Sequence, residues 1–427
     1  MTSPIWHPFT QHGLGEPIPL VERAEGAALY TRDGRRVIDA ISSWWVTTHG
    51  HCYPPIMAAI AAHAGRLDQM IFAGWTHEPA EALARDLVAL MPNLHGQAPL
   101  AHVFFSDSGS TCVEVALKMA LGYWANRGEP RHRIMVMEHS YHGDTIGAMS
   151  VGARGVFNQP YAALLFDVGT VPFPATGREQ ATLDALELAC RSEAPAAFIV
   201  EPLVLGSGGM LVYPAWVLAE MRRICAVHGV LFIADEVMTG WGRTGTMLAC
   251  EQAGVVPDLL CLAKGLTGGS LPLAVTMATP AIFEAHYSTD RARQFFHSSS
   301  YTANAIACAA ANANLAVWRD EPVQGRIDTL VARQSALLAG FAQLPGVINP
   351  RQIGTIIAID VEAPSGAGYL SEVAPRLLTH FREANVLLRP LGNTVYAMPP
   401  YCIGQDDLDT IGAVVGEAVA GLGSVKP

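Results

Sequence analysis

Short apolar runs alternate with helical patterns through the middle of the chain, and this alternation constrains the fold more than any other feature of the sequence. The apolar runs are AHVFFSDSGS, RHRIMVMEHSYHG, AAFIVEPLV, VLFIADEV and DLLCLAKG, and the stretches TCVEVALKMALGYW and AWVLAEMRRICAVHG between them are helical in pattern. Runs rich in Val, Ile, Leu and Phe that are separated by helices indicate βαβ units and a mostly parallel sheet. Such sheets bind ligands beyond the carboxyl ends of their strands, so we expect functional residues directly after each run.

The two ends of the chain have a different pattern. GAALYTRDGRRVIDA predicts a hairpin that turns at Asp33-Gly34. Near the other end, IGTIIAIDV and NVLLRPLGNTVYAMPPY predict strands with a Gly-Asn turn between the last two, and LVARQSALLAGFAQL predicts a helix. With 427 residues, the chain is long enough for two domains. We therefore predict a large α/β domain over residues 55–315 and a smaller α+β domain formed by residues 1–54 and 316–427.

The composition argues against several classes of protein. Half of the residues are hydrophobic and 15% are charged, which is typical of a large folded core and not of a disordered chain. The net charge of −11, without a basic stripe, argues against a nucleic-acid partner. No signal peptide and no membrane-spanning segment are expected, and eight scattered cysteines without a C-x-x-C pair indicate reduced thiols in the cytoplasm. The segments HGH and HSYH supply too few ligands for a metal site.

The run FFSDSGSTCVEVALKMA passes from a strand into a helix through Ser108-Gly109-Ser110. Gly109 allows the backbone to approach a ligand closely, and the amides at a helix N-terminus favour an anion such as a phosphate. Thr111 and Glu114 also have the spacing of a capping box, so the alternative is a well-capped helix that binds nothing.

Two further polar residues end apolar runs: Asp235 in VLFIADEV and Lys264 in DLLCLAKG. A buried acid needs a partner that offsets its desolvation, and the alternatives here are an ion pair with Arg243 or a magnesium ion. A lysine among apolar residues has a lowered pKa and is a candidate Schiff-base nucleophile, unless it extends to the surface. The other two lysines, Lys118 in a helical stretch and Lys426 near the end of the chain, are poorer candidates.

Together these residues match the needs of pyridoxal phosphate. The helix start takes the phosphate, the acid holds the pyridine nitrogen protonated so that the ring acts as an electron sink, and the lysine carries the aldehyde as an imine. Tyr141, after another predicted strand, has a ring that can stack on the cofactor; the alternative is a tyrosine packed at the edge of the sheet.

The motifs SDSGSTCVEVALKMA, YHGDTIGAMS, IADEVMTGWGRTG and DLLCLAKGLTGG, in this order, resemble those of the class III pyridoxal-phosphate aminotransferases of fold type I. The resemblance spans nearly the whole chain. It implies a large domain with a mostly parallel sheet flanked by helices, a smaller α+β domain, and a homodimer whose active sites lie at the subunit interface.

Within this class, four segments resemble the enzymes that aminate 8-amino-7-oxononanoate to 7,8-diaminononanoate in biotin biosynthesis, with S-adenosylmethionine as the usual donor. These segments are WHPFTQ, DAISSWWVTTHGH, HSSSYTANAIACAAANANL and RPLGNTVYAMPPY. The resemblance implies a ping-pong transamination. The alternatives are a broader ω-aminotransferase that uses diamines, β-alanine or 4-aminobutyrate with a 2-oxo acid, an aminomutase, and a non-catalytic protein on the same fold.

The resemblance implies a role for each matching residue. Lys264 binds the cofactor as the internal aldimine and then moves the proton between Cα and C4′. Asp235 pairs with the pyridine nitrogen, Gly109 and Ser110 bind the phosphate, and Tyr141 lies against the ring.

Other positions are implied to complete the site. Ser299 and Ser300 reach the phosphate of the partner subunit's cofactor, and Trp44 and Ser298 line the substrate pocket. Arg389 holds the substrate carboxylate, which suits a guanidinium because it can donate two parallel hydrogen bonds to a carboxylate.

Two departures from the family pattern bear on the amino donor. Phe9 stands in WHPFTQ where many members have tyrosine, so a polar contact to the substrates is lost while the ring can still stack on an adenine. HSSSYT replaces a more usual Gly-Pro-Thr tripeptide; Ser300 keeps a hydroxyl for the phosphate, but Ser298 lacks the backbone freedom of glycine. Some related enzymes use lysine as the donor, so the donor stays open here.

Overall fold

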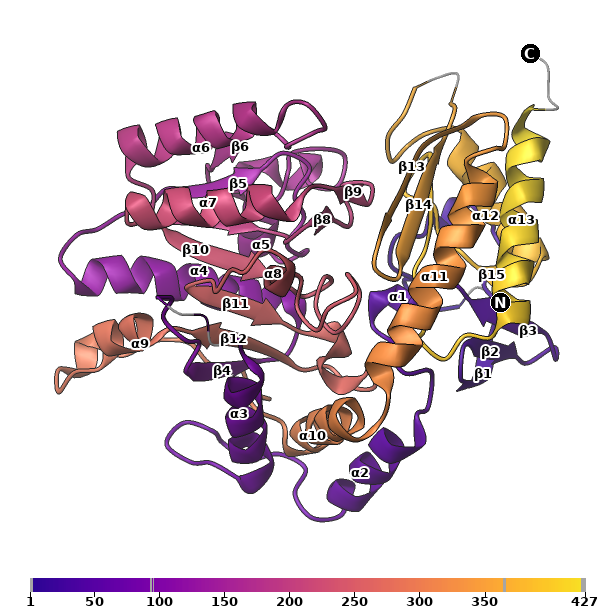
Figure 1. Cartoon of the computed structure of the whole chain (residues 1–427). Helices are drawn as coiled ribbons and strands as arrows, with labels where there is room; N and C mark the ends of the chain where they lie inside the picture. Colours follow the sequence, from indigo (N-terminus) through magenta and orange to yellow (C-terminus); the bar gives the residue numbers. More distant parts are fainter. Residues whose placement is uncertain (1–2, 93, 95, 364–365, 424–427) are drawn as a thin grey trace.

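The computed structural model describes residues 3–92, 94, 96–363 and 366–423, and its two bodies lie side by side (Figure 1). The larger body is built on a seven-stranded sheet in the order β4-β12-β11-β10-β7-β5-β6. Its strands are β4 (His102–Ser106), β5 (Ile134–Met137), β6 (Gly169–Val171), β7 (Ala197–Val200), β10 (Leu231–Asp235), β11 (Leu259–Leu262) and β12 (Ala274–Ala278).

Only β12 runs against its neighbours in this sheet, since it pairs antiparallel with both β11 and β4 while the pairs from β11 to β6 are parallel. The five apolar runs named from the sequence form β4, β5, β7, β10 and β11, so the predicted mostly parallel α/β sheet is confirmed. β6 and β12 were not among the predicted strands. The parallel strands point their carboxyl ends toward one edge, which is where the site lies.

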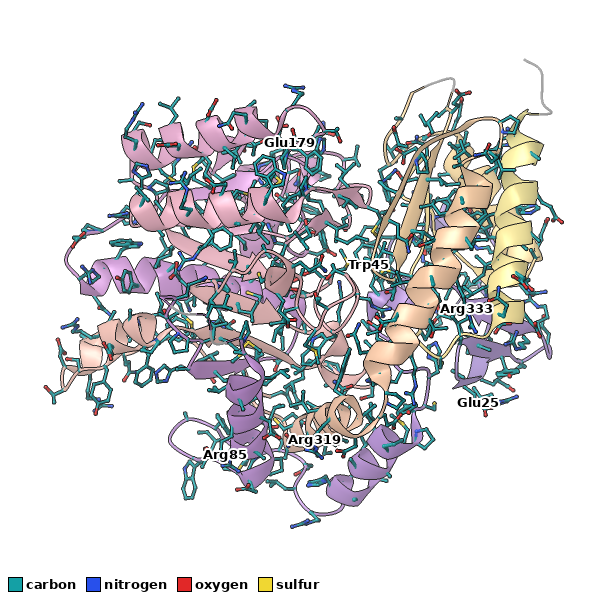
Figure 2. The ribbon with its side chains drawn as sticks, in the orientation of Figure 1. Glu25, Trp45, Arg85, Glu179, Arg319 and Arg333 are labelled. Carbon is teal, nitrogen blue, oxygen red and sulfur yellow. The ribbon has the colours of Figure 1, made fainter. Side chains whose placement is uncertain are left out.

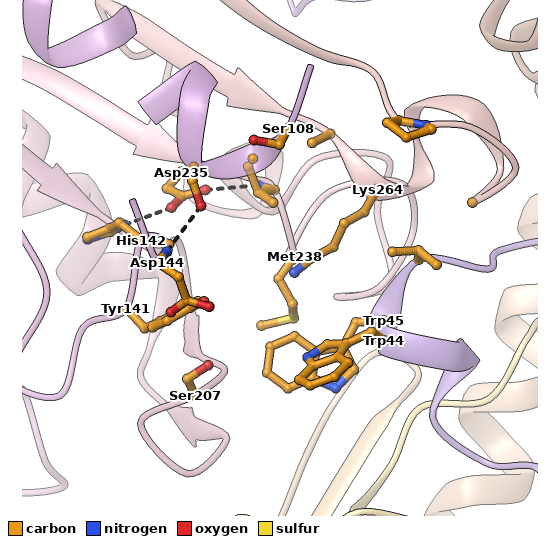
Figure 3. Close-up of a pocket in the computed structure, with 18 of the residues that line it drawn as sticks. Trp44, Trp45, Ser108, Tyr141, His142, Asp144, Ser207, Asp235, Met238 and Lys264 are labelled. Atoms are coloured by element: carbon orange, nitrogen blue, oxygen red, sulfur yellow. Dashed lines mark hydrogen bonds and ion pairs between the residues drawn. The ribbon is translucent and has the colours of Figure 1, made fainter. Parts of the chain in front are cut away.

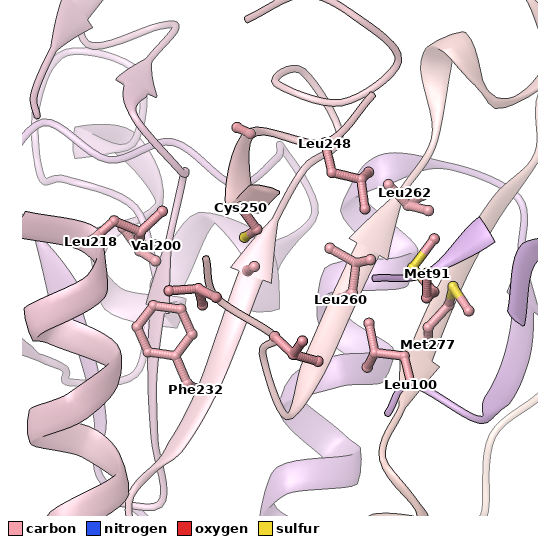
Figure 4. Close-up of a cluster of buried hydrophobic side chains, with 14 of the residues drawn as sticks. Met91, Leu100, Val200, Leu218, Phe232, Leu248, Cys250, Leu260, Leu262 and Met277 are labelled. Atoms are coloured by element: carbon pink, nitrogen blue, oxygen red, sulfur yellow. The ribbon is translucent and has the colours of Figure 1, made fainter. Parts of the chain in front are cut away.

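Helices cover both faces of the sheet. Successive residues of a strand point to opposite faces. Phe232 therefore packs in one apolar core with α6 and α7 (Figure 4). Ile233 packs in another core with α4. The helices of this body are α2 (Pro54–Ala64), α3 (Glu78–Leu90), α4 (Gly109–Asn126), α5 (Ile146–Ser150), α6 (Glu179–Glu193), α7 (Ala215–Val227), α8 (Ala249–Gln252), α9 (Pro280–His286) and α10 (Ala305–Asp320).

The smaller body joins the two ends of the chain. One sheet has the order β1-β2-β3-β15 and another the order β13-β14-β16, and α11, α12 and α13 complete the body. A single apolar core holds residues from both ends, including Ile38, Trp45, Phe381 and Tyr396. The bounds are β1 (Val21–Glu25), β2 (Ala28–Thr31), β3 (Arg36–Asp39), β13 (Val347–Ile353), β14 (Ile356–Val361), β15 (Val386–Leu387), β16 (Thr394–Ala397), α11 (Val323–Phe341), α12 (Val373–Glu383) and α13 (Gln405–Gly423).

Short elements connect the two bodies. They are the helical turn α1 (Ser42–Trp45) and the small hairpin of β8 (Val204–Leu205) and β9 (Leu211–Val212). Figure 2 shows Trp45 between the bodies, whereas the labelled charged residues lie on the outside. Within the described ranges, no helix is both long enough and apolar enough to span a bilayer.

The predictions made from the sequence for the smaller body are partly confirmed. The hairpin at Asp33-Gly34 is present, and Gly34 has a φ of 85° that suits glycine at this turn. The predicted strand IGTIIAIDV is present as β14 from Ile356 on, but its first residue, Ile353, ends β13, because the chain turns at Gly354 (φ 50°). A side chain at Gly354 would collide with the backbone of Thr244, so this turn is fixed by a contact distant in sequence. The domain limits at residues 54 and 315 stay a prediction, and α10 crosses the second of them.

Candidate active site

A cavity of about 470 Å³ lies between the two bodies, at the carboxyl edge of the large sheet (Figure 3). The larger body contributes the ends of β10 and β11 and the start of α4, and the smaller body contributes the turn at Trp44 and Trp45 together with Arg389 and Tyr396. Sequence-predicted residues that line it are Phe9, Trp44, Gly109, Ser110, Tyr141, Asp235, Lys264 and Arg389.

Lys264 directly follows Ala263, after β11, and its side chain enters the cavity (Figure 3). Desolvation by burial lowers the pKa of its amine from 10.5 to about 8, although the charges of Asp235 and Glu201 act in the opposite direction. Its Nζ lies 4.8 Å from the centroid of the Trp45 ring. The amine is therefore substantially neutral at mildly alkaline pH, as a nucleophile must be.

Asp235 ends β10 and is 5% exposed. Its Oδ2 lies 2.7 Å from Nδ1 of His142, and its Oδ1 accepts a hydrogen bond from the backbone of Val237 at 3.1 Å. The alternative of an ion pair with Arg243 is wrong, because that guanidinium instead donates to the carbonyl oxygens of Thr47 and Pro399. A carboxylate fixed in this way can hold a cationic ring nitrogen.

His142 and Glu201 belong to the site but were not predicted. In the described part of the chain, the buried Nε2 of His142 has no hydrogen-bond partner. Glu201 follows β7, and its two oxygens accept hydrogen bonds from the backbone of Tyr141 (2.9 Å) and of Gly206 (3.0 Å). Burial raises the pKa of this carboxyl to about 7. Glu201 directly follows the apolar run of β7, and His142 lies five residues after the end of β5; these positions after strands are the signal that could have found them.

The start of α4 brings Ser108, Gly109 and Ser110 to the cavity wall. The capping box is formed by Ser108 and Thr111, so the predicted box of Thr111 with Glu114 is wrong. Glu114 instead accepts hydrogen bonds from the loop that follows Tyr141, starting with the Thr145 hydroxyl at 2.6 Å. The cap places the helix N-terminus toward the cavity, where its amides favour an anion.

Several aromatic side chains also line the wall. The rings of Phe9 and Trp44 lie 5.5 Å apart, and Nη2 of Arg389 donates to the carbonyl oxygen of Phe9 at 3.0 Å. Tyr141 also lines the cavity, and burial raises the pKa of its hydroxyl. Sequence reasoning missed Trp45, although it adjoins Trp44, and it also missed four lining residues from other segments: Phe157, Met238, Tyr369 and Tyr396.

Ser298, Ser299 and Ser300 are not among the residues that line this cavity. They form an outward-facing turn in which the backbone amide of Ser299 donates to the Thr302 hydroxyl at 3.0 Å. The carbonyl oxygen of Ser300 accepts from the side chain of Gln69 at 2.8 Å. The structure of one chain therefore does not bring these serines to Lys264.

The groups that surround the cavity fit pyridoxal phosphate. A lysine with a lowered pKa, a buried carboxylate held by a histidine, and a helix N-terminus surround one cavity. A Cβ atom at position 109 would come within 2.7 Å of the Val237 side chain. Glycine fits this position, and without a side chain it leaves the helix amides open to a ligand. Fold and site together define a pyridoxal-phosphate-dependent enzyme of fold type I.

Comparisons with known proteins identify the family. The model of aminotransferase class III matches residues 10–419. An adenosylmethionine-8-amino-7-oxononanoate aminotransferase of Synechococcus elongatus is 45% identical over 97% of this chain and 97% of that protein. One of Nitratidesulfovibrio vulgaris is 40% identical over 97% of this chain and 80% of that protein.

Similarity to solved structures supports the same family. The adenosylmethionine-8-amino-7-oxononanoate aminotransferase of Methanocaldococcus jannaschii has a TM-score of 0.92 at 31% identity, over 98% of this chain and 97% of that one. An amine transaminase of an uncultivated Pseudomonas species, in its PLP-bound internal aldimine form, has a TM-score of 0.89 at 30% identity, over 99% of both chains. The chain belongs to the class III aminotransferases, and pyridoxal phosphate is its cofactor.

Proposed function

We propose that the enzyme transfers an amino group from S-adenosylmethionine to 8-amino-7-oxononanoate, which gives 7,8-diaminononanoate for biotin biosynthesis. Relatives of the same name at 45% and 40% identity support this reaction. The observation that carries it is the group of Phe9, Trp44 and Arg389 at the cavity that also holds Lys264. This group offers apolar surface for a long chain or an adenine and a cation for a carboxylate.

Each residue of the site has a task in a transamination. Bound pyridoxal phosphate supplies an electron sink for the carbon that exchanges its amine. The neutral Nζ of Lys264 would hold the cofactor through its aldehyde and, when free, would take the proton from the substrate carbon and return it. Asp235 would keep the pyridine nitrogen of the cofactor protonated, and His142 fixes the orientation of Asp235 from the other side.

The α4 N-terminus would hold the phosphate through Gly109 and Ser110, and Tyr141 would hold the ring by stacking. Arg389 binds the substrate carboxylate, since its remaining N–H groups can donate two parallel hydrogen bonds. Both substrates use the same cavity in turn, as a ping-pong reaction requires.

The active enzyme is a homodimer in this proposal, and Ser299 and Ser300 reach the phosphate bound by the partner subunit. The exposed aromatic side chains beside this turn, Phe296 (63% exposed) and Tyr301 (62%), support a buried role in a dimer. Trp75 (68%) lies on the segment that follows Gln69, which is itself hydrogen-bonded to Ser300. Ser298 then lines the shared pocket from the partner's side, and the cytoplasm is the compartment that suits this pathway.

The deciding experiment measures 7,8-diaminononanoate formed from 8-amino-7-oxononanoate with S-adenosylmethionine, lysine and 4-aminobutyrate as separate donors. Product with S-adenosylmethionine supports the proposal, and product with lysine alone keeps the acceptor and changes the donor. No product with any donor contradicts it. Pyruvate-dependent turnover of simple amines would then favour a broader ω-aminotransferase, a second candidate that the 0.91 TM-score to the (S)-enantioselective ω-transaminase of Thermomicrobium roseum (28% identity) supports.

A further inference from the structure

Two consecutive residues, Trp44 and Trp45, line the same cavity. A regular strand would point them to opposite sides, and a regular helix would turn them about 100° apart. The exposed fractions are 46% for Trp44 and 6% for Trp45, so one indole lies at the mouth and the other inside. Figure 3 shows both on the side of the pocket that faces Lys264. The backbone around them must therefore depart from regular structure.

The departure is a run of left-handed backbone angles. Ser42, Ser43 and Trp45 have φ values of 53°, 61° and 65°, and none of them is a glycine. Ser43 combines its φ of 61° with a ψ of −106°, which lies outside the small left-handed region open to side-chain-bearing residues. Such strain persists only where the surroundings fix it, and it concentrates at functional sites.

Asp39 is the group that fixes this turn. Its side chain is fully buried, with an exposed fraction of 0%. Oδ1 accepts a hydrogen bond from the Ile41 backbone at 3.2 Å, and Oδ2 accepts one from the Ser43 backbone at 2.6 Å. Nε2 of His51 lies 2.7 Å from Oδ2 and orients the carboxylate from behind. The strained residue Ser43 is thus tied directly to the acid.

Trp45 connects the turn at residues 42–45 to the amine of Lys264. The indole N–H of Trp45 donates to the Tyr396 hydroxyl at 2.8 Å, and its ring lies 4.8 Å from Nζ of Lys264. The turn also packs on the loop after Lys264, because a side chain at Gly269 would come within 2.6 Å of the Val46 backbone. A change in the turn would therefore move both the cavity wall and the surroundings of the amine.

We propose that Asp39 is a positioning residue, which holds the strained turn so that both tryptophans face the active-site cavity. It acts on substrate binding through Trp44 and Trp45 and touches neither substrate nor cofactor. The role applies to the class III aminotransferase reaction and depends on the proposed function only for the choice of substrate.

The test is Asp39→Asn in the cofactor-loaded enzyme. An amide of the same shape has one acceptor oxygen, so it cannot accept from Ile41, Ser43 and His51 as the carboxylate does. We expect the KM for 8-amino-7-oxononanoate to rise about 10-fold or more with a smaller change in kcat, because the cavity wall shifts while the lysine stays. The near-ultraviolet circular dichroism of the tryptophans should also change, with far-ultraviolet signal and cofactor content retained.

A second substitution, Ser43→Gly, should reverse the KM defect of Asp39→Asn. Glycine adopts these angles without strain, so the turn no longer needs the acid to hold it. We expect Asp39→Asn in the Ser43→Gly background to recover most of the lost KM, a coupling that a purely structural defect would not show. Asp33→Asn is the matched control, since Asp33 makes its contacts with Thr31 and Arg35 on an exposed turn of the same hairpin and should leave KM unchanged.

An unchanged KM in Asp39→Asn would overturn the proposal, as would a KM defect that Ser43→Gly leaves in full. If the wild-type enzyme does not turn over 8-amino-7-oxononanoate, the proposed function fails and not this inference. The near-ultraviolet spectra then decide alone: a tryptophan signal altered by Asp39→Asn and restored by Ser43→Gly supports the role of Asp39, and an unaltered signal contradicts it.

Discussion

Lys264 differs from Lys118 in its surroundings and not in its chemistry. Nζ of Lys118 donates to the carbonyl oxygen of Phe296 at 2.8 Å on an exposed surface, and it does not line the cavity. Lys264 is surrounded by the cavity wall, which lowers the pKa of its amine to about 8. Desolvation is therefore what makes the Lys264 amine a nucleophile at mildly alkaline pH.

Replacing that amine gives the first prediction. Lys264→Ala should still fold and bind the cofactor, but the visible absorbance of lysine-bound cofactor should be absent and transamination should fall by roughly 10²–10⁴-fold or more, because no group remains to move the proton. Lys118→Ala is the control and should keep both. Lysine-bound absorbance that survives in Lys264→Ala would show that another lysine carries the cofactor.

The lowered pKa predicts how cofactor uptake depends on pH. Only the neutral amine attacks the aldehyde, so the rate of uptake by cofactor-free enzyme should rise about tenfold per pH unit below pH 8 and level off above it. Stopped-flow absorbance measures this rate. Free lysine treated in the same buffers corrects for the ionisation of the cofactor itself. A midpoint near 10.5, the ordinary lysine value, would contradict the burial argument.

At the scale of elements, the N-terminus of α4 requires a residue without a side chain at Gly109. A side chain at Gly109 would approach Cγ1 of Val237 to 2.7 Å, and the amide of Val237 donates to Asp235. An added methyl here therefore disturbs the phosphate contact and the acid together. This close approach couples the start of α4 to the residues that directly follow β10.

Gly109→Ala should weaken cofactor binding. Overpacking at such a contact costs about 1–3 kcal/mol, which equals about 5- to 150-fold in the dissociation constant. Equilibrium dialysis at falling cofactor concentration measures the change. Gly65→Ala is a suitable control, because Gly65 has an ordinary φ of −93° and no heavy atom within 4 Å of an added Cβ. Equal affinities in the two variants would show that the α4 start does not bind the phosphate.

The elements that carry the site could be predicted because each apolar run ends in a polar residue. Asp235 is the last residue of β10 and Lys264 lies two residues after β11, and parallel strands bring such residues to one edge. The partners of these residues could not be predicted in the same way. His142 meets Asp235 across 93 residues, and Trp45 meets Tyr396 across 351, so only the packed structure defines those contacts.

At the scale of the whole molecule, the cavity needs both bodies. Lys264 and Asp235 belong to the large sheet, while Arg389, Tyr396 and the tryptophan turn belong to the smaller body, whose core joins both ends of the chain. The sequence indicated that the ends assemble together, since both had strand patterns unlike the middle. The resemblance also implied that Ser299 and Ser300 serve a second subunit, and this stays a prediction, because these serines, which lie on an exposed turn, do not line the cavity of one chain.

A mixing experiment tests whether that turn serves the partner subunit. In a homodimer with shared sites, a hybrid of Lys264→Ala and a Ser299→Ala, Ser300→Ala subunit has one site with an intact lysine and intact serines. Each parent should be strongly impaired, since one lacks the amine and the other lacks two phosphate contacts. Random reassociation should restore activity toward about one quarter of wild type, because half of the dimers are hybrids with one good site of two.

If the serines instead served their own chain, no hybrid site would hold both the lysine and the serines. The mixture would then stay at the average of its parents. Activity of unmixed and mixed samples, after the same dissociation and reassociation treatment, distinguishes the two cases. Wild-type enzyme carried through the treatment shows how much activity the procedure itself preserves. Recovery would place the exposed turn, with its flanking Phe296 and Tyr301, at a subunit interface that completes each active site.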